Sequence, residues 1–223
     1  MKNIWFIVIF TGLGFFALQV PVTQLAGSKA TFTLFDFFGP IATGFIGVLP
    51  GLAAIFLMQF INFLVHGANV VDLGTIIRFF PMLFAALYFG MKSRAILLVP
   101  LVAIAAFNLH PIGRTVWYYS LFWVIPILCH FARDRSLFFK SLGTTFTAHA
   151  VGGALWIHVF ELPQAVWISL IPVVLVERLL FTAGIAGMYV VLNNALNFLI
   201  ERKLVTLKFM IDRKYLAAKK RAV

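Results

Sequence analysis

Two ionisable residues lie side by side within an apolar stretch in the last third of the chain. The stretch reads LIPVVLVERLLFTAG over residues 170–184, and Glu177 and Arg178 stand at its centre. A charged side chain in hydrocarbon costs about 2.5–3.5 kcal/mol on insertion scales, so such residues usually have a partner or a function. Adjacent positions on a helix point about 100° apart, so we expect the two side chains to have separate partners. Each partner is either another helix, in a structural ion pair, or a polar solute.

A histidine lies on a second apolar stretch, residues 138–160. His149 is followed on nearly the same helical face by Trp156. Small residues at a spacing of four, with which membrane helices pack closely, occur on this stretch and on the last one: Thr144, Ala148, Gly152, Ala183 and Gly187. We therefore expect the two stretches to pack together and to bring His149, Trp156 and Glu177 toward one cavity. The alternative for His149 is a hydrogen-bonded core histidine.

Two further charged residues stand at the start of apolar stretches. Asp36 opens residues 35–49, and Arg78 lies near the start of residues 74–91. We expect both at the outer level of a membrane, where they either face the same solute or snorkel to the headgroups. Arg178 is expected to pair with Asp36 or to meet the headgroups.

Motifs for several other chemistries are absent from the sequence. There is no His-x-x-x-His or His-Glu-x-x-His pair for a metal, no Gly-x-Ser-x-Gly for a nucleophile and no Walker sequence for ATP. The single cysteine, Cys129, excludes an intrachain disulfide. We therefore expect no catalytic residue, no metal and no cofactor.

The composition indicates a membrane protein that spans the bilayer several times. Of the 223 residues, 62% are hydrophobic and 11% are charged, and the mean hydropathy is +1.01; soluble domains are about 45–50% apolar and about 25% charged. The net charge of +11 could indicate nucleic acid, but eight of the 18 Lys and Arg residues lie between Arg202 and Arg221. Cations that follow an apolar stretch bind an anionic leaflet. We expect contacts with membrane lipids and none with nucleic acid.

Apolar stretches long enough to cross the hydrocarbon core predict the membrane spans. Eight are expected within one helical domain of residues 1–201: 3–23, 35–49, 51–66, 74–91, 95–109, 115–131, 138–160 and 172–200. Pro50, followed by Gly51, separates the second span from the third. One tilted helix over residues 35–66 is the alternative and gives seven spans.

The distribution of Lys and Arg predicts which segments face the cytoplasm. Both span counts place residues 92–94, residues 133–140 and the basic tail, 202–223, on the inner side. The eight-span arrangement also places the N-terminus there. Within the tail, apolar residues at helical spacing predict a surface helix over residues 204–215.

The order of features along the chain has a recognisable pattern. The first segment is TLFDFFGPIATGFIGVLPGLAAIFLMQFINFLVHG, which has Asp36 and Phe37 near its start and a turn between Gly47 and Gly51. It is followed by DLGTIIRFFPMLFAALYFGMKSR. Later, TTFTAHAVGGALWIHVF leads to ELPQAVWISLIP and then to VERLL. This order resembles the substrate-binding S components of energy-coupling factor (ECF) transporters, over about two-thirds of the chain.

The resemblance implies an S-component-like core of six helices, in which residues 95–131 are an additional hairpin peripheral to the solute cavity. The first helix also departs from the family, because it lacks the Ala-x-x-x-Ala pair with which many S components pack on the coupling subunit. The resemblance also implies a multi-pass protein of the cell membrane whose two termini are both cytoplasmic.

The implied function is solute binding for an ECF-type ABC importer. The chain would capture a small vitamin-like molecule from the outer side, and a transmembrane coupling subunit with ATPase subunits would drive transport. The cavity would lie between the loops 24–34, 66–73 and 161–171 and the last two helices. Its candidate binding residues are those introduced above: Glu177, His149, Trp156, Arg178, Arg78 and Asp36.

Two other functions stay open from the residues alone. One is a membrane-embedded enzyme that acts on a lipid or isoprenoid with His149 and Glu177 as an acid–base pair. The other is a small non-catalytic scaffold.

Overall fold

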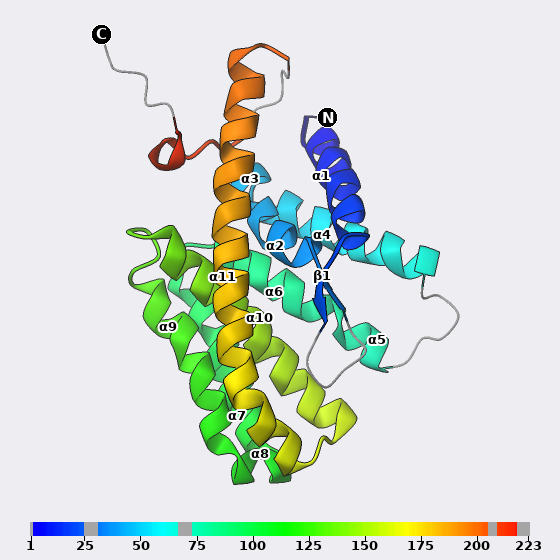
Figure 1. Cartoon of the computed structure of the whole chain (residues 1–223), viewed down its shortest axis with the longest axis vertical. Coiled ribbons are helices and arrows are strands. Elements are labelled where there is room, and N and C mark those ends of the chain that lie inside the picture. Colours follow the sequence, from blue (N-terminus) through cyan, green and yellow to red (C-terminus); the bar gives the residue numbers. More distant parts are fainter. Residues whose placement is uncertain (1, 25–30, 67–72, 205–208, 218–223) are drawn as a thin grey trace.

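The chain is almost entirely helical. The computed structural model describes residues 2–24, 31–66, 73–204 and 209–217 (Figure 1). Its elements in chain order are α1 (Lys2–Leu18), β1 (Pro21–Gln24), β2 (Thr31–Thr33), α2 (Phe35–Phe38), η1 (Gly39–Ile41), α3 (Ala42–Ile46), α4 (Val48–His66), α5 (Leu73–Ile77), α6 (Phe79–Gly90), η2 (Arg94–Leu97), α7 (Leu98–Leu109), α8 (Pro111–Thr115), η3 (Trp117–Val124), α9 (Ile125–His130), α10 (Leu137–Phe160), α11 (Gln164–Glu201) and η4 (Arg213–Tyr215). The prediction of a helical fold is confirmed, with one unpredicted addition: β1 and β2 form an antiparallel ribbon.

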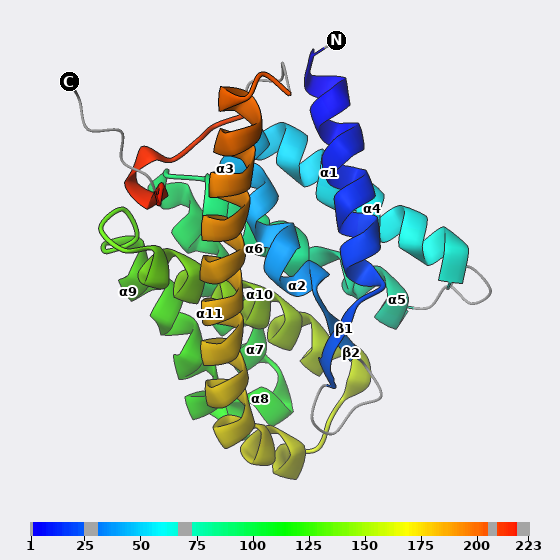
Figure 2. The ribbon, with the colours of Figure 1, turned by 45° about the horizontal axis from the view of Figure 1, so that its top comes forward.

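The longest helix, α11, runs along the length of the molecule in both ribbon views (Figures 1 and 2). Its 38 residues span about 57 Å at 1.5 Å per residue. It begins at Gln164, so the outer loop expected over residues 161–171 is wrong in extent: α10 ends at Phe160, and residues 161–163 make the connection. Pro172 lies inside the helix without ending it, and Trp167, buried in the second turn, anchors this early part of α11.

The break predicted between the second and third apolar stretches is confirmed, but it falls at Gly47 rather than at Pro50. Gly47 has φ +91°, a conformation that glycine adopts without the steric cost that a Cβ imposes. Pro50 instead lies in the first turn of α4, where the N–H that proline lacks would have no helical acceptor. One continuous helix over residues 35–66 is therefore excluded.

Residues 95–131 form a helical hairpin, as the resemblance implied. Helix α7 leads to a turn at α8, and η3 and α9 return along it (Figure 1). The hairpin packs on α10 and shares an apolar cluster with it and with the first half of α11. The buried members of this cluster are Ala103, Phe107, Val116, Tyr119, Trp123, Phe146, Ala150, Ala154, Ile157, Trp167 and Val174.

A second apolar cluster joins α1–α4 and α6 to the second half of α11. It is rich in phenylalanine, and its fully buried large side chains are Phe10, Ile41, Phe45, Ile55, Met58 and Phe89. The two clusters lie one after the other along α11, so this helix holds the two halves of the molecule together.

The small residues of α10 pack against a different helix from the one expected. A Cβ at Gly143 would overlap Tyr88, and one at Gly152 would contact Pro81, so this face of α10 packs on α6. On α11, a Cβ at Gly187 would have no neighbouring atom within 4 Å, and Ala183 is exposed. Helices α10 and α11 do pack together, as predicted, but the predicted contact through two small-residue faces is wrong, because such a stripe favours close packing without specifying the partner.

Many large apolar side chains lie on the surface of the molecule, as expected for a protein surrounded by hydrocarbon. On α11 alone the exposed ones are Ile168, Leu175, Val176, Leu179, Leu180, Val190, Val191 and Phe198. By length and composition, two of the described helices could cross a membrane, α4 over Val48–Val65 and α11. The other apolar helices are shorter, and the count of eight spans stays a prediction.

Residues 209–217 of the tail, called the strap here, are irregular apart from the single 3-10 turn η4, so the surface helix expected over 204–215 is wrong for these residues. Asn193 donates to the carbonyl of Asp212 (2.9 Å) and accepts from its N–H (2.9 Å). Asn194 donates to the carbonyl of Tyr215 (2.9 Å) and accepts from the N–H of Ala217 (2.8 Å). Two amides on α11 thus replace the hydrogen bonds that a helix would make.

Candidate functional site

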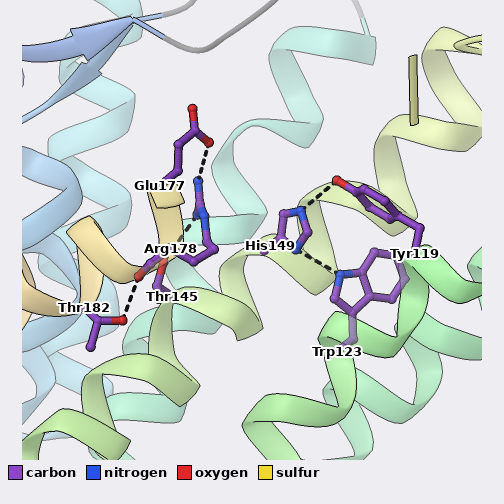
Figure 3. A network of polar contacts seen from close by, with 7 residues as sticks. All are labelled: Tyr119, Trp123, Thr145, His149, Glu177, Arg178 and Thr182. Carbon is purple, nitrogen blue, oxygen red and sulfur yellow. Dashed lines mark hydrogen bonds and ion pairs between the residues drawn. The ribbon is translucent and has the colours of Figure 1, made fainter. Parts of the chain in front are cut away.

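Arg178 is a buried cation in the middle of α11. It lies 14 residues after Gln164, the first residue of the helix, about 21 Å along the axis, and the residue is 8% exposed. Its Nη1 donates to Thr145 Oγ1 on α10 (3.3 Å), and its Nη2 lies 3.5 Å from Glu177 Oε2 (Figure 3). Its Cζ lies over the ring of Phe181, 4.6 Å from the centroid. The charged pair thus lies almost four turns from the start of α11.

Glu177 and Arg178 pair with each other, and the expectation of separate partners is wrong. The side chains leave the helix in different directions, but both are long enough to meet beside it (Figure 3). Both contacts of the guanidinium are long for charge-assisted hydrogen bonds, which are about 2.7–2.9 Å. In addition, Arg178 Nε has no partner among the described residues. The guanidinium, with five N–H groups, therefore keeps unused donor capacity.

The charge of Asp36 acts on the same guanidinium without forming a close pair with it. The Asp36 carboxylate accepts the N–H of Thr33 (2.8 Å), which closes the turn between β2 and α2. Among the described residues, the one close ion pair of Arg178 is with Glu177, and Asp36 attracts it electrostatically from further away. Asp36, one of the two partners predicted for Arg178, is therefore not in direct contact with it, and a contact with headgroups stays a prediction.

Aromatic rings from two distant segments complete the surroundings of Arg178. Phe32 of β2 lies 5.5 Å from its Cζ and packs edge-on against Phe181. Phe37 of α2 contacts Phe181 as well and fills the space over Gly184. The ribbon and α2 are thereby held against α11 at the level of the charged pair.

His149 uses both ring nitrogens in contacts with the hairpin. Trp123 Nε1 donates to Nδ1 (3.1 Å), and Tyr119 Oη lies 2.9 Å from Nε2 (Figure 3). Because the indole N–H can only donate, Nδ1 must accept, and the proton of the neutral ring is on Nε2. The alternative of a hydrogen-bonded core histidine accounts for both nitrogens. The hairpin is therefore not peripheral to every candidate residue, contrary to expectation.

The remaining candidates lie apart from the charged pair. Trp156 is half-buried in the cluster around the hairpin and contacts Phe160, and Arg78 is exposed before α6. Figure 3 shows the Glu177 carboxylate directed away from His149, so the two members of the alternative acid–base pair do not meet. The structure thus pairs Glu177 with Arg178, places Asp36 and His149 near enough to interact electrostatically with that guanidinium, and leaves Trp156 and Arg78 elsewhere.

The sequence did not identify Thr145, Phe32, Phe181 or Tyr119 as site residues. A lone aromatic residue in a Phe-rich chain carries no sequence signal that separates a site from the core. Two of the expected cavity walls, the loops 24–34 and 66–73, lie largely outside the described residues. Among the residues that are described, no group of three or more His, Cys, Asp or Glu could hold a metal ion.

The arrangement is suited to binding an anion that carries an apolar part. A guanidinium with spare N–H groups can hold a carboxylate, and rings beside it can pack against the rest of a small molecule. No family model matches the chain, and no curated protein or solved structure matches it either.

Proposed function

We propose that the chain is a membrane-embedded solute-binding subunit of the S-component type. It captures a small vitamin-like molecule from the outer side of the cell membrane, and a transmembrane coupling subunit and ATPase subunits drive its transport. Both termini are cytoplasmic in this proposal. The observation that supports it best is the under-coordinated guanidinium of Arg178 in the middle of an apolar helix.

The geometry at Arg178 favours a ligand over a purely structural ion pair. A buried pair offsets its desolvation only when its geometry is good and further hydrogen bonds satisfy the remaining donors. Here the contacts measure 3.3 and 3.5 Å, and Nε has no partner among the described residues. An anionic solute would supply the missing acceptors, with Glu177 as the counter-charge when the solute is absent.

The resemblance to S components supports the transport part of the proposal. The two segments that carry it, the one starting at Asp36 and the one containing Glu177, meet at the guanidinium of Arg178 through Phe37 and Phe181. Because the sequence has no ATP-binding motif, energy for transport would come from other subunits.

Binding is tested first on the detergent-solubilised protein. Small molecules that copurify are identified by mass spectrometry, and thermal unfolding is measured with and without a panel of carboxylate-bearing and uncharged vitamins. We expect at least one carboxylate-bearing compound to raise the melting temperature, since a ligand that binds only the folded state stabilises it.

The role of Arg178 is tested with Arg178→Gln and a matched control, Arg94→Gln, which removes an exposed arginine that is not a candidate binding residue. Stabilisation by the compound should be lost in the first variant and kept in the second. The proposal fails if Arg178→Gln folds and keeps full stabilisation, or if no member of the panel stabilises the wild-type chain and nothing copurifies.

Topology is tested by cysteine labelling in intact cells, after Cys129→Ala removes the one native thiol. A cysteine at Glu161, between α10 and α11, should react with an impermeant reagent from outside. A cysteine at Arg135, between α9 and α10, should react only after the cells are opened. The reverse pattern would invert the proposed orientation.

A further inference from the structure

A basic pocket of about 370 Å³ lies at the end of the molecule where the strap crosses the helices. Five segments that are far apart in the sequence form it: α3, the end of α6, the residues that precede and open α10, the middle of the second half of α11, and the strap. Its ionisable lining residues are Lys92, Arg133, Asp134, Lys140, Asp212 and Arg213. Four cations against two carboxylates leave a formal charge of +2.

Lys140 is the central cation of this basic pocket. Its Nζ lies 3.8 Å from the ring centroid of Phe89 and 5.3 Å from that of Tyr189, and both rings line the pocket. Among the described residues, no oxygen accepts a hydrogen bond from this ammonium group, and Asp134 and Asp212 attract it only from beyond ion-pair distance. An ammonium group held over two rings keeps its three N–H donors free for an anion.

The other cations of the basic pocket differ in whether their N–H donors are already used by the protein or are available to a ligand. Arg133 donates to the carbonyls of Phe89 (2.8 Å) and Met91 (2.9 Å), so it fixes the wall of the pocket. Lys92 and Arg213 are exposed, and no described residue forms an ion pair with them. These two side chains can turn toward a ligand that Lys140 holds.

The strap closes one side of the basic pocket. Asn193 and Asn194 hold its main chain on α11, and Lys214 Nζ donates to the carbonyls of Asp134 (3.2 Å) and Arg135 (2.7 Å). Figure 2 shows the strap, in red, lying beside the start of α10. The pocket is thus a fixed feature of the fold.

The geometry points to a binding site for a phosphate-bearing anion in this basic pocket, with Lys140, Lys92 and Arg213 as its ligands. A phosphate group offers several charged oxygens and can accept from three separate cations at once. The volume fits a phosphorylated headgroup or a small phosphate compound. The same chemistry is presented by the headgroup of an anionic phospholipid and by free phosphate.

The test uses the full chain in an uncharged detergent. Native mass spectrometry measures the retention of phosphatidylglycerol against phosphatidylcholine, and equilibrium dialysis measures the binding of inorganic phosphate. The variants are Lys140→Gln and Lys92→Gln, with Arg135→Gln as the matched control, because Arg135 follows the pocket residues Arg133 and Asp134 in the connection from α9 to α10 but does not itself line the pocket. Far-UV circular dichroism checks the fold of each.

We expect about a fivefold or greater loss of phosphatidylglycerol retention in each pocket variant and none in the control. If inorganic phosphate binds saturably and competes with the lipid, the ligand is phosphate itself. If the lipid binds but inorganic phosphate does not, the ligand is the lipid headgroup. The proposal is overturned if the wild-type chain binds neither probe. It is also overturned if Arg135→Gln loses as much binding as folded Lys92→Gln, since surface charge alone would then explain the effect.

Discussion

Two arginines among the described residues are buried, and they are bound in different ways. Arg133 is 4% exposed and Arg178 is 8% exposed, and each lies over an aromatic ring, that of Tyr88 or that of Phe181. Arg133 donates to two main-chain carbonyls at 2.8 and 2.9 Å, although its Nε, like that of Arg178, has no partner among the described residues. The contacts of Arg178 are with side chains and are longer, at 3.3 and 3.5 Å.

This difference separates a structural cation from one that is available for binding. Main-chain carbonyls at the end of a helix are fixed acceptors, and Arg133 supplies hydrogen bonds that the last turn of α6 lacks. Glu177 and Thr145 can instead rotate away when another acceptor arrives. Burial alone would therefore misassign one of the two residues, whereas the kind of acceptor and its distance distinguish them.

The largest expected effect on stability comes from Arg133→Gln. The change leaves two main-chain carbonyls without their charged donor, and hydrogen bonds to charged groups contribute about 1.5–3 kcal/mol each. We expect the free energy of unfolding in detergent to fall by about 3–5 kcal/mol. Denaturant titration followed by circular dichroism measures it, and a loss below about 1 kcal/mol would contradict a structural role.

Arg178→Gln should lower the free energy of unfolding less than Arg133→Gln does, and it should weaken solute binding more. Its partner Glu177 is 13% exposed and retains some access to solvent, so we expect a loss of about 1–3 kcal/mol. The same titration applies, together with the solute assay proposed above. If the stability loss equals that of Arg133→Gln and solute binding is unchanged, Arg178 has a structural role like that of Arg133.

Glu177→Gln tests whether this carboxylate is a counter-charge or a solute ligand. If it only neutralises Arg178, its removal relieves repulsion of an anionic solute, and binding should tighten by up to about tenfold, equivalent to about 1.4 kcal/mol. Isothermal titration with the stabilising compound measures the change. Weaker binding would show that Glu177 contacts the solute itself, as the sequence predicted.

The smallest loss of stability is expected when an uncharged buried group, the hydroxyl of Tyr119, is removed. This variant sets the lower limit against which the two arginine variants are compared. Tyr119→Phe removes one hydrogen-bond partner of His149 and should cost about 0.5–1.5 kcal/mol without changing solute binding. Nitrogen NMR of the imidazole should still report the proton on Nε2, because Trp123 continues to donate to Nδ1. A loss of solute binding in this variant would extend the site to His149.

The sequence predicted elements better than contacts, for reasons visible in particular residues. The helical stretches, the break between residues 47 and 51 and the hairpin at 95–131 followed from apolar runs and from Gly and Pro, which act locally. Pro172 misled the prediction, because a buried Trp167 stabilises helix before it. The small-residue face of α10 indicated close packing, but one sequence cannot say that α6 is the partner.

The charged pair was predicted as a site, and its internal geometry was not. Rotation about the helix axis separates Glu177 from Arg178, yet the length of both side chains allows contact. The basic pocket was out of reach of sequence reasoning, since it depends on two asparagines that bind main-chain atoms of residues about 20 positions later. The residue type of these two asparagines does not indicate which main-chain atoms they bind.

The strap also has a consequence for biosynthesis. The N–H of Met210 donates to the carbonyl of Phe45, so α3 completes its contacts only after a segment that follows every long described helix has been made. Contacts of such separation form late. The helices can enter the bilayer as they leave the ribosome, but the basic pocket exists only after the strap has been released and has docked. A ribosome stalled shortly after residue 204 would therefore hold an inserted chain with this end of the molecule still open.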